Sequence, residues 1–246
     1  VLDRDANMIF MNYGWSDVDG EAAPLALQPE DEPNRYCIQL YHRVASAVDL
    51  EGMDVLEVGS GRGGGASFVK RYLAPRTMTG VDLAANAISF CRQQYDVPGL
   101  TFVRGDAQAL EFGDRSFDAV INVESSHCYP SMARFVGEVV RVLRPGGHLL
   151  YADHRMQDDV AGLCQQFQEA GLTVVAEERL NAGVVRALVQ DNARKQALIE
   201  RQVPWMLRPL FSRFAAMEGT GSIYGTLLSG ARVYVRFVLR KEEALT

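Results

Sequence analysis

The sequence has few cysteines and lacks any paired metal-binding motif. Its four cysteines are Cys37, Cys91, Cys128 and Cys164, which lie far apart and form no CxxC pair. A zinc finger needs such pairs and a disulfide framework needs a denser set, so the spacing excludes both. We interpret the four residues as reduced core thiols of a cytoplasmic protein.

Long apolar runs and an excess of positive charge are also absent. No apolar run reaches the roughly 18 residues that a membrane-spanning helix needs, and we expect no signal peptide. With 25 basic against 31 acidic residues the formal net charge is −6, which argues against nucleic acid as a partner. The 246 residues, 48% of them hydrophobic, are enough for one sizeable α/β domain.

The most informative stretch is a short apolar run that is followed by glycines. Residues 54–58 are mostly bulky and apolar, as in a strand buried on both faces, and five of the seven residues 59–65 are glycine. Glycine permits a sharp turn and lets a ligand approach the backbone closely. Apolar residues then recur at helical spacing over 68–73. This order predicts a nucleotide-type pocket at the carboxyl end of the strand.

The glycines alone leave alternatives open. Gly59, Gly61 and Gly64 also match the dinucleotide fingerprint of NAD enzymes, and a tight turn without a ligand needs glycine as well. Asp82 ends the next predicted strand 21 positions after Gly61, close to the ~20 expected of an acid that binds ribose hydroxyls. Capping of the following helix is the alternative role for Asp82.

Strands and helices are predicted to alternate along most of the chain. This pattern predicts an α/β fold, a Rossmann-like doubly wound sheet of seven mostly parallel strands. Apolar and polar residues alternate over 231–240, which favours an antiparallel last strand with one polar face. The predicted strands are 54–58, 78–83, 100–103, 116–123, 148–153, 172–178 and 231–240, and the predicted helices include 32–48, 86–95, 132–143 and 158–170.

Several short motifs follow one another along the chain. They are Glu57-x-Gly59-x-Gly61-x-Gly63, Asp82, Gly105-Asp106-Ala107, Phe117-Asp118 and Leu143-Arg144-Pro145-Gly146-Gly147. An NAD-binding domain has no reason to carry the last three of them in these places. Over about residues 35–180 this set resembles that of class I S-adenosylmethionine (SAM) methyltransferases.

This resemblance implies SAM as the cofactor and assigns residues to it. Gly59 and Gly61 would pass close to its methionyl part, and Asp82 would accept its ribose hydroxyls. Asp106 would accept the adenine amino group, Ala107 would line the adenine pocket, and Glu57 would orient the loop or the ammonium. The further expected cofactor residues are Ser60, Leu83, Asn122 and Glu124.

Four other stretches are informative, and they lie at residues 11–15, 38–43, 63–67 and 124–130. They are similar to a narrower group, the mycobacterial phthiotriol/phenolphthiotriol dimycocerosate methyltransferases and related fatty-acid O-methyltransferases. This similarity implies SAM-dependent O-methylation of a lipophilic acceptor, either a fatty-acid carboxyl or a lipid hydroxyl. A sugar or polyketide hydroxyl is an alternative acceptor, and a SAM-binding module without turnover is an alternative class.

Two histidines follow the ends of neighbouring predicted strands, His127 after the fourth and His154 after the fifth. We predict both as catalytic residues, because a histidine pKa near ~6.5 suits removal of a hydroxyl proton. Hydrogen bonding to a backbone or capping group is the alternative. Asp153 beside His154 is expected to orient it or to help bind a metal. One acid without a neighbouring Asp-Asn pair is a poor metal signal, so we predict no metal.

Residues 183–217 interrupt the alternation of strands and helices. They hold six basic and two acidic residues, a local charge of six minus two, or +4. We predict a helical lid over an apolar acceptor, with transient lipid contact as a further role. A helix pair that completes the core is the alternative. The predicted acceptor-binding residues are Tyr13, Trp15, Trp205, Met206 and Phe211.

The chain therefore divides into four predicted parts. They are an N-terminal flap (1–35), a SAM-binding Rossmann-like core (36–182), a helical acceptor-lid insertion (183–230), and a last strand with a tail (231–246). We expect a monomer or a homodimer.

Overall fold

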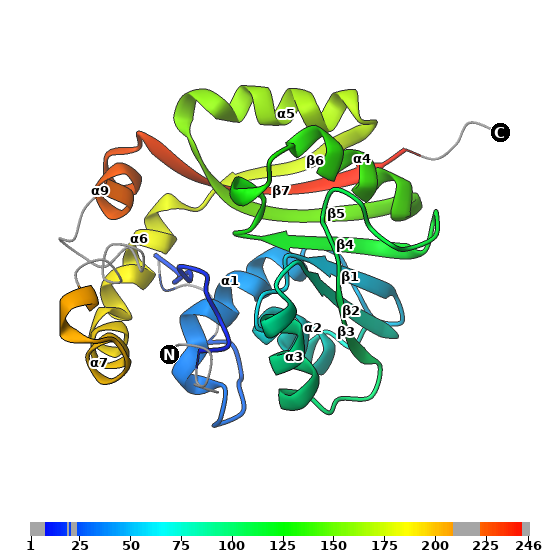
Figure 1. Cartoon of the computed structure of the whole chain (residues 1–246). Helices are drawn as coiled ribbons and strands as arrows, with labels where there is room; N and C mark the ends of the chain where they lie inside the picture. The colour runs from blue at the N-terminus through cyan, green and yellow to red at the C-terminus, as the bar shows by residue number, and fades with distance from the viewer. Residues whose placement is uncertain (1–7, 19, 21–23, 209–221, 243–246) are drawn as a thin grey trace.

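The computed structural model describes residues 8–18, 20, 24–208 and 222–242. They form one seven-stranded sheet with helices on both faces (Figure 1). The strand order is β3-β2-β1-β4-β5-β7-β6. The strands are β1 (Asp54–Val58), β2 (Thr77–Asp82), β3 (Leu100–Arg104), β4 (Phe117–Val123), β5 (Leu143–Met156), β6 (Leu172–Arg179) and β7 (Arg232–Lys241).

The pairing of these strands confirms the predicted fold class. The strands β1 to β5 pair in parallel, whereas β7 pairs antiparallel with both β5 and β6. The chain leaves β1 toward β2 on one side and returns to β4 on the other. The carboxyl ends of β1 and β4 therefore mark the topological switch point, where ligands bind in open α/β sheets.

Two separate apolar clusters hold the helices against the sheet. One cluster joins α1, α2 and α3 to one face, and the other joins α4 and α5 to the opposite face (Figure 1). The helices and short 3-10 turns are η2 (Glu32–Asn34), α1 (Arg35–Ala45), α2 (Gly64–Tyr72), α3 (Ala85–Gln94), η3 (Ser126–Cys128), α4 (Met132–Val142), η4 (Gln157–Asp159), α5 (Val160–Glu169), α6 (Asn181–Gln190), α7 (Asn192–Gln202), η5 (Trp205–Leu207) and α9 (Ser222–Ser229).

The last strand is antiparallel as predicted, but its second face is not a polar surface. Val233, Val235 and Phe237 pack into the cluster with α4 and α5. Tyr234 and Val238, on the other face, are also buried and belong to the cluster with α1 and α2. Because β7 lies between β5 and β6, helices cover it on both sides.

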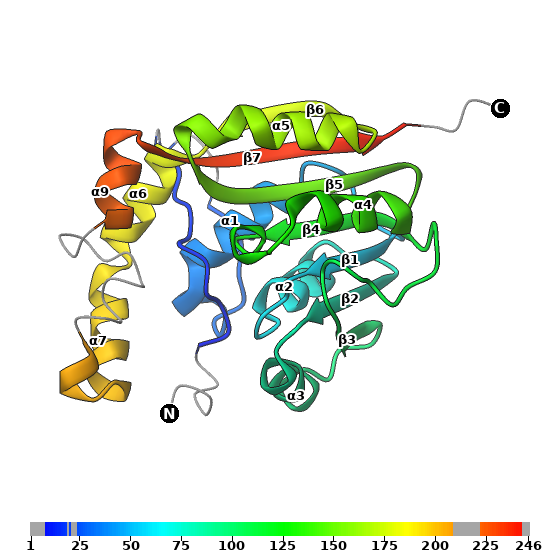
Figure 2. The ribbon, with the colours of Figure 1, turned by 45° about the horizontal axis from the view of Figure 1, so that its top comes forward.

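The helical insertion stands at the carboxyl end of the parallel strands. In Figures 1 and 2, α6, α7 and α9 lie together beyond that end, next to the N-terminal segment. Asn181, the first residue of α6, fixes them to the sheet. Its Nδ2 donates to the carbonyls of Leu227 at 2.9 Å and Arg232 at 2.8 Å, and its Oδ1 accepts from the N–H of Tyr234 at 2.8 Å.

Three details differ from the sequence-based expectations or extend them. The strand β5 begins at Leu143, so the Arg-Pro-Gly-Gly motif lies in the strand and not before it. All four cysteines are free, but the prediction of core thiols is wrong for Cys128, which is exposed in η3, and Cys164 is only half-buried. Within the described residues no helix has the length and apolar character to span a membrane.

Candidate active site

The turn after β1 brings the backbone of neighbouring strands together. The N–H of Gly59 donates to the carbonyl of Val81 at 2.8 Å, and the N–H of Gly61 donates to Oδ2 of Asp82 at 2.8 Å. Gly59 has a φ of +77°, and a Cβ there would lie 2.3 Å from Oγ of Ser125. Only glycine fits this position, since it alone combines positive φ with such a close approach.

Three buried acceptor atoms around this turn have no hydrogen-bond partner among the described residues. They are Oε2 of Glu57, Oγ of Ser60 and Oδ1 of Asn122. A buried polar atom left unpaired is costly, so such a group points to a ligand that bonds to it. SAM carries an ammonium group and hydroxyls that donate, and its sulfonium is positively charged. The atoms present therefore fit SAM.

Glu57 is the most strongly perturbed of these residues. It is fully buried at the end of β1, and its Oε1 accepts from the hydroxyl of Tyr41 at 2.5 Å. Burial raises the pKa of Glu57 to about 8. A cation bound beside this carboxyl would favour its charged form, because an opposite charge lowers a carboxyl pKa.

A histidine and a buried aspartate form a hydrogen-bonded pair at the ends of β4 and β5. Nδ1 of His127 lies 2.8 Å from Oδ1 of Asp153, which is 0% exposed. Ser126 Oγ and the N–H of His127 donate to the other oxygen at 2.6 and 2.9 Å. Burial alone would raise the pKa of Asp153. The hydrogen bond from His127 and the charge of Arg155 outweigh burial and hold this pKa below its usual range.

This arrangement fixes the proton positions on His127. The charged Asp153 accepts only, so Nδ1 of His127 carries a proton and Nε2 keeps its lone pair when the ring is neutral. Burial alone would lower the pKa of His127, but the hydrogen bond and charge of Asp153 outweigh it and raise the pKa above its usual value. Because Asp153 orients the ring and stabilises its charged form, His127 can accept a proton from a hydroxyl.

The second histidine has different partners. The rings of His154 and His127 lie 4.3 Å apart between centroids, and the ring of Tyr13 stacks on His154 at 5.6 Å. Arg232 is the first residue of β7, and its Nη1 lies 3.0 Å from Nδ1 of His154. Burial is the main reason that the pKa of His154 falls to about 4.

Glu124 connects the N-terminal segment to the sheet. Its Oε1 accepts from the N–H of Tyr13 and from the hydroxyl of Tyr234, both at 2.8 Å. Glu124 has a φ of +47°, an unusual value for a residue other than glycine. Burial raises the pKa of Glu124 to about 7.

Comparison with known proteins decides the family. Residues 56–151 match the methyltransferase domain family. A phthiotriol/phenolphthiotriol dimycocerosates methyltransferase of Mycobacterium leprae is 44% identical over 213 residues, which cover 87% of this chain and 78% of that protein. A fatty-acid O-methyltransferase of Mycolicibacterium smegmatis is 43% identical over 211 residues, covering 86% and 76%. The chain belongs to this family of SAM-dependent methyltransferases.

Solved structures share the fold of this methyltransferase at low sequence identity. The geranyl diphosphate C-methyltransferase of Streptomyces coelicolor has a TM-score of 0.68 at 14% identity, over 96% of this chain and 93% of that one. The [4+2]-cyclase SpnF has a TM-score of 0.71 at 20% identity, over 96% and 88%. Because a cyclase shares the fold, the fold alone does not identify the reaction.

The predicted cofactor residues of the methyltransferase lie at the carboxyl ends of β1 to β4. Asp82 bonds to Gly61 and, through Oδ1, to the N–H of Ala84 at 2.9 Å, so it also stabilises the start of α3. Asp106 and Leu83 are exposed, and Leu83 is 65% exposed. Their contacts with SAM stay predictions. The other predicted cofactor residues in this region are Glu57, Gly59, Ser60, Gly61, Ala107, Asn122 and Glu124.

The structure brings the two predicted catalytic histidines together but changes the role of Asp153. The carboxylate of Asp153 bonds to the ring of His127, whereas it bonds to His154 only through the main-chain N–H, at 2.8 Å. A ligand atom from each of His127, Asp153 and His154 lies within 4.8 Å of the others, the spacing of a metal site. Arg155 and Arg232 bring positive charge to the same atoms, which opposes a cation. The absence of a metal stays a prediction.

The predicted acceptor residues are spread over a wider area. Tyr13 contacts His154, and Trp15 packs against Gly183 of α6 and beneath Arg43, whose guanidinium lies 4.5 Å from the indole centroid. Trp205 and Met206 in η5 are 74% and 70% exposed. Phe211 lies outside the described residues. The N-terminal segment crosses the site, since the carbonyl of Ile9 accepts from the N–H of Gly64 at 3.2 Å.

Sequence reasoning missed three residues that shape the site of the methyltransferase. Arg232 and Tyr234 come from β7, and Tyr41 comes from α1. The alternation over 231–240 placed Arg232 and Tyr234 on one face of a strand, but no sequence signal showed that β7 pairs with β5. The register that sets Arg232 opposite Met156 brings that face to the site.

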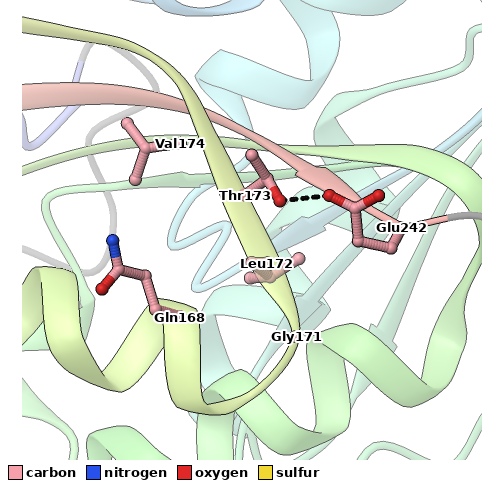
Figure 3. Close-up of a pocket in the computed structure, with 6 residues that line it drawn as sticks. All are labelled: Gln168, Gly171, Leu172, Thr173, Val174 and Glu242. Carbon is pink, nitrogen blue, oxygen red and sulfur yellow. Dashed lines mark hydrogen bonds between the residues drawn. The ribbon is translucent and has the colours of Figure 1, made fainter.

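A small pocket of about 340 Å³ lies elsewhere on the methyltransferase, between the end of α5 and the start of β6 (Figure 3). Thr173 hydrogen-bonds to Glu242 within it, and Gln168 and Val174 complete its wall. Leu172, which also lines the pocket, pairs with Lys241 at the far end of β7 from Arg232. None of the predicted site residues lines this pocket.

Proposed function

We propose that this methyltransferase transfers the methyl group of SAM to an oxygen of a lipophilic acceptor, with His127 as the general base. The observation that carries the proposal is the pairing of His127 with the buried Asp153 at the carboxyl edge of the sheet. The relatives named for dimycocerosates and fatty acids support a lipophilic acceptor. SAM supplies a methyl group that is already activated, so positioning of the acceptor provides much of the rate.

The residues of the site then have separate tasks. Glu57, Ser60 and Asn122 offer acceptor atoms to SAM, and Asp82 offers its carboxylate to the ribose. His127 takes the proton of an acceptor hydroxyl on Nε2 while Asp153 holds the ring and stabilises its charged form. Transfer forms one carbon–oxygen bond, breaks the sulfur–methyl bond and leaves that proton on His127.

A fatty-acid carboxyl is the second candidate acceptor, because one relative is named a fatty-acid O-methyltransferase. A carboxylate is ionised already, so it would need no base. A sugar or polyketide hydroxyl remains the alternative to a lipid.

The experiment is a methylation assay with SAM and matched acceptors, read by mass spectrometry. The panel is a long-chain alcohol, a fatty acid of the same chain length, a lipid diol and a glycoside. The proposal expects an O-methylated lipid product, and each added methylene should lower the Michaelis constant by up to roughly fourfold until the acceptor site is full. A Michaelis constant that does not change with chain length would overturn the lipid acceptor and favour the glycoside.

We also infer that η5 meets the lipid surface from which the acceptor comes. Trp205, Met206 and Leu207 are 74%, 70% and 45% exposed. Arg208 follows them in the chain, and Arg201 lies four residues before Trp205. Apolar side chains beside basic ones suit an anionic lipid surface. Binding to vesicles of anionic phospholipid should fall in Trp205→Ala but not in Val175→Ala, which removes a side chain 58% exposed on β6. Equal binding of both variants would refute the inference.

A further inference from the structure

We propose that Arg232 fixes His154 as a hydrogen-bond donor, so that His154 and His127 together select a hydroxyl acceptor over a carboxylate. Arg232 is thus a positioning residue and His154 a specificity-determining one. The inference rests on the proposed O-methyl transfer, and it goes further by choosing between the two acceptor classes.

Arg232 sets the tautomer of His154. Nη1 of Arg232 lies 3.0 Å from Nδ1 of His154. A guanidinium only donates, so Nδ1 must offer a lone pair, and the proton of the neutral ring sits on Nε2. His154 is 6% exposed. Its burial, together with the charges of His127 and Arg232, keeps the ring neutral, although Asp153 favours the charged form.

The neighbouring ring, His127, carries its proton on the other nitrogen, Nδ1. His127 gives its Nδ1 proton to Asp153 and keeps a lone pair on Nε2. With centroids 4.3 Å apart, two charged imidazoles would repel each other strongly. Asp153 from β5 favours the positive charge on His127. Arg232 from β7 and Arg155 from β5 disfavour a positive charge on His154. Among the described residues, Tyr13 and Glu124 also face the pair.

The two rings together are suited to recognise a hydroxyl. One ring offers an acceptor and the other offers a donor, which matches a hydroxyl, a group that both donates and accepts. An ionised carboxylate has no proton to give, so it would leave the lone pair of His127 unpaired when that ring is neutral, the form in which it acts as a base. The side chain of His127 is 30% exposed, so this cost applies once the bound acceptor covers the ring and excludes water. A polar group left unpaired in this way weakens binding of the wrong ligand by roughly 10- to 100-fold.

The position of Arg232 is itself well fixed. Its carbonyl accepts from Nδ2 of Asn181 at 2.8 Å, and the strand register sets it opposite Met156. The same Asn181 also bonds to Leu227 of α9. The helical insertion and the side chain that orients His154 are therefore anchored at one point.

The first test reads the tautomer directly, without any acceptor. In protein labelled with ¹⁵N-histidine, long-range ¹H–¹⁵N spectra from pH 5 to 8 should show His154 with its proton on Nε2, and of these two rings only His127 should titrate. In Arg232→Met both tautomers of His154 should appear, and Arg232→Lys should restore the wild-type form in part. A wild-type His154 with its proton on Nδ1, or identical spectra in Arg232→Met, would overturn the proposal.

The second test measures selectivity with a long-chain alcohol and the matched fatty acid. The ratio of their kcat/KM values should fall roughly 10- to 100-fold in Arg232→Met. Arg240→Met, at the far end of β7 opposite His148, is the matched control and should keep the wild-type ratio. An unchanged ratio in Arg232→Met overturns the selection of hydroxyls. Methylation of neither acceptor by the wild type refutes the proposed function instead, while the spectra still report on His154.

Discussion

Replacement of Asp153 by asparagine tests the pair at the centre of the site. Asp153 is 0% exposed, and one of its oxygens takes the Nδ1 proton of His127 at 2.8 Å. Asparagine keeps the shape but has only one acceptor oxygen. If that oxygen stays with Ser126 and the N–H of His127, the amide NH₂ faces the ring, so His127 loses its acceptor or changes tautomer. General-base catalysis contributes about 10²–10⁴ in rate, and we expect Asp153→Asn to lose most of it.

The same change should also destabilise the fold, and the two effects must be separated. Arg155 lies 3.1 Å from Asp153 and its side chain is 14% exposed. Removing one partner of a buried ion pair costs about 3–5 kcal/mol, so Asp153→Asn should melt at a lower temperature. Turnover is therefore measured well below that melting temperature, with SAM affinity from calorimetry as the control for an intact cofactor site.

A double-mutant cycle with His127→Ala shows whether Asp153 acts through His127. If it does, the double variant should turn over no more slowly than His127→Ala alone, because the lost step is the same. The acid limb of the pH–rate profile should also move to lower pH in Asp153→Asn, since Asp153 is what raises the pKa of His127. If the two losses in turnover multiply in the double variant and the acid limb does not move, Asp153 does not act through His127.

Three further predictions concern the cofactor site and the lid. Asp82→Ala should weaken SAM binding roughly 10- to 100-fold in calorimetry, because ribose hydroxyls lose a charged acceptor; unchanged affinity in a folded variant would contradict this. Without SAM, melting temperature should fall as pH rises from 4.5 to about 8, because burial raises the pKa of Glu57 from 4.5 to about 8 and the stability of its protonated form is lost over that window. Glu57→Gln should flatten this dependence, and a pH-independent wild type would argue against it. Trp205→Ala should raise the Michaelis constant for long acceptors but keep the melting temperature, since the indole is 74% exposed; a lower melting temperature would instead place it in the core.

The order of the strands shows where sequence reasoning reaches its limit. Alternating patterns are local, so they predicted each strand and the antiparallel direction of β7. The place of β7 between β5 and β6 depends on pairing between residues far apart in the chain, such as Leu150 and Val238. That pairing also explains why Tyr234 is buried although the pattern suggested a polar face.

The partner of Asp153 is a second example. Asp153 and His154 are neighbours in sequence, which suggested that they act together. Successive side chains of a strand point to opposite faces, so the ring that meets the carboxylate comes from another segment, at His127. The glycine turn was easier to predict, because its positive φ values leave a direct mark on the sequence.

The most direct test of the central claim is the turnover of His127→Ala with saturating SAM and a long-chain alcohol, followed as methyl ether by mass spectrometry. The account predicts a fall of about 10²–10⁴ in turnover with SAM affinity unchanged. Turnover equal to that of the wild type would contradict the claim that His127 is the general base.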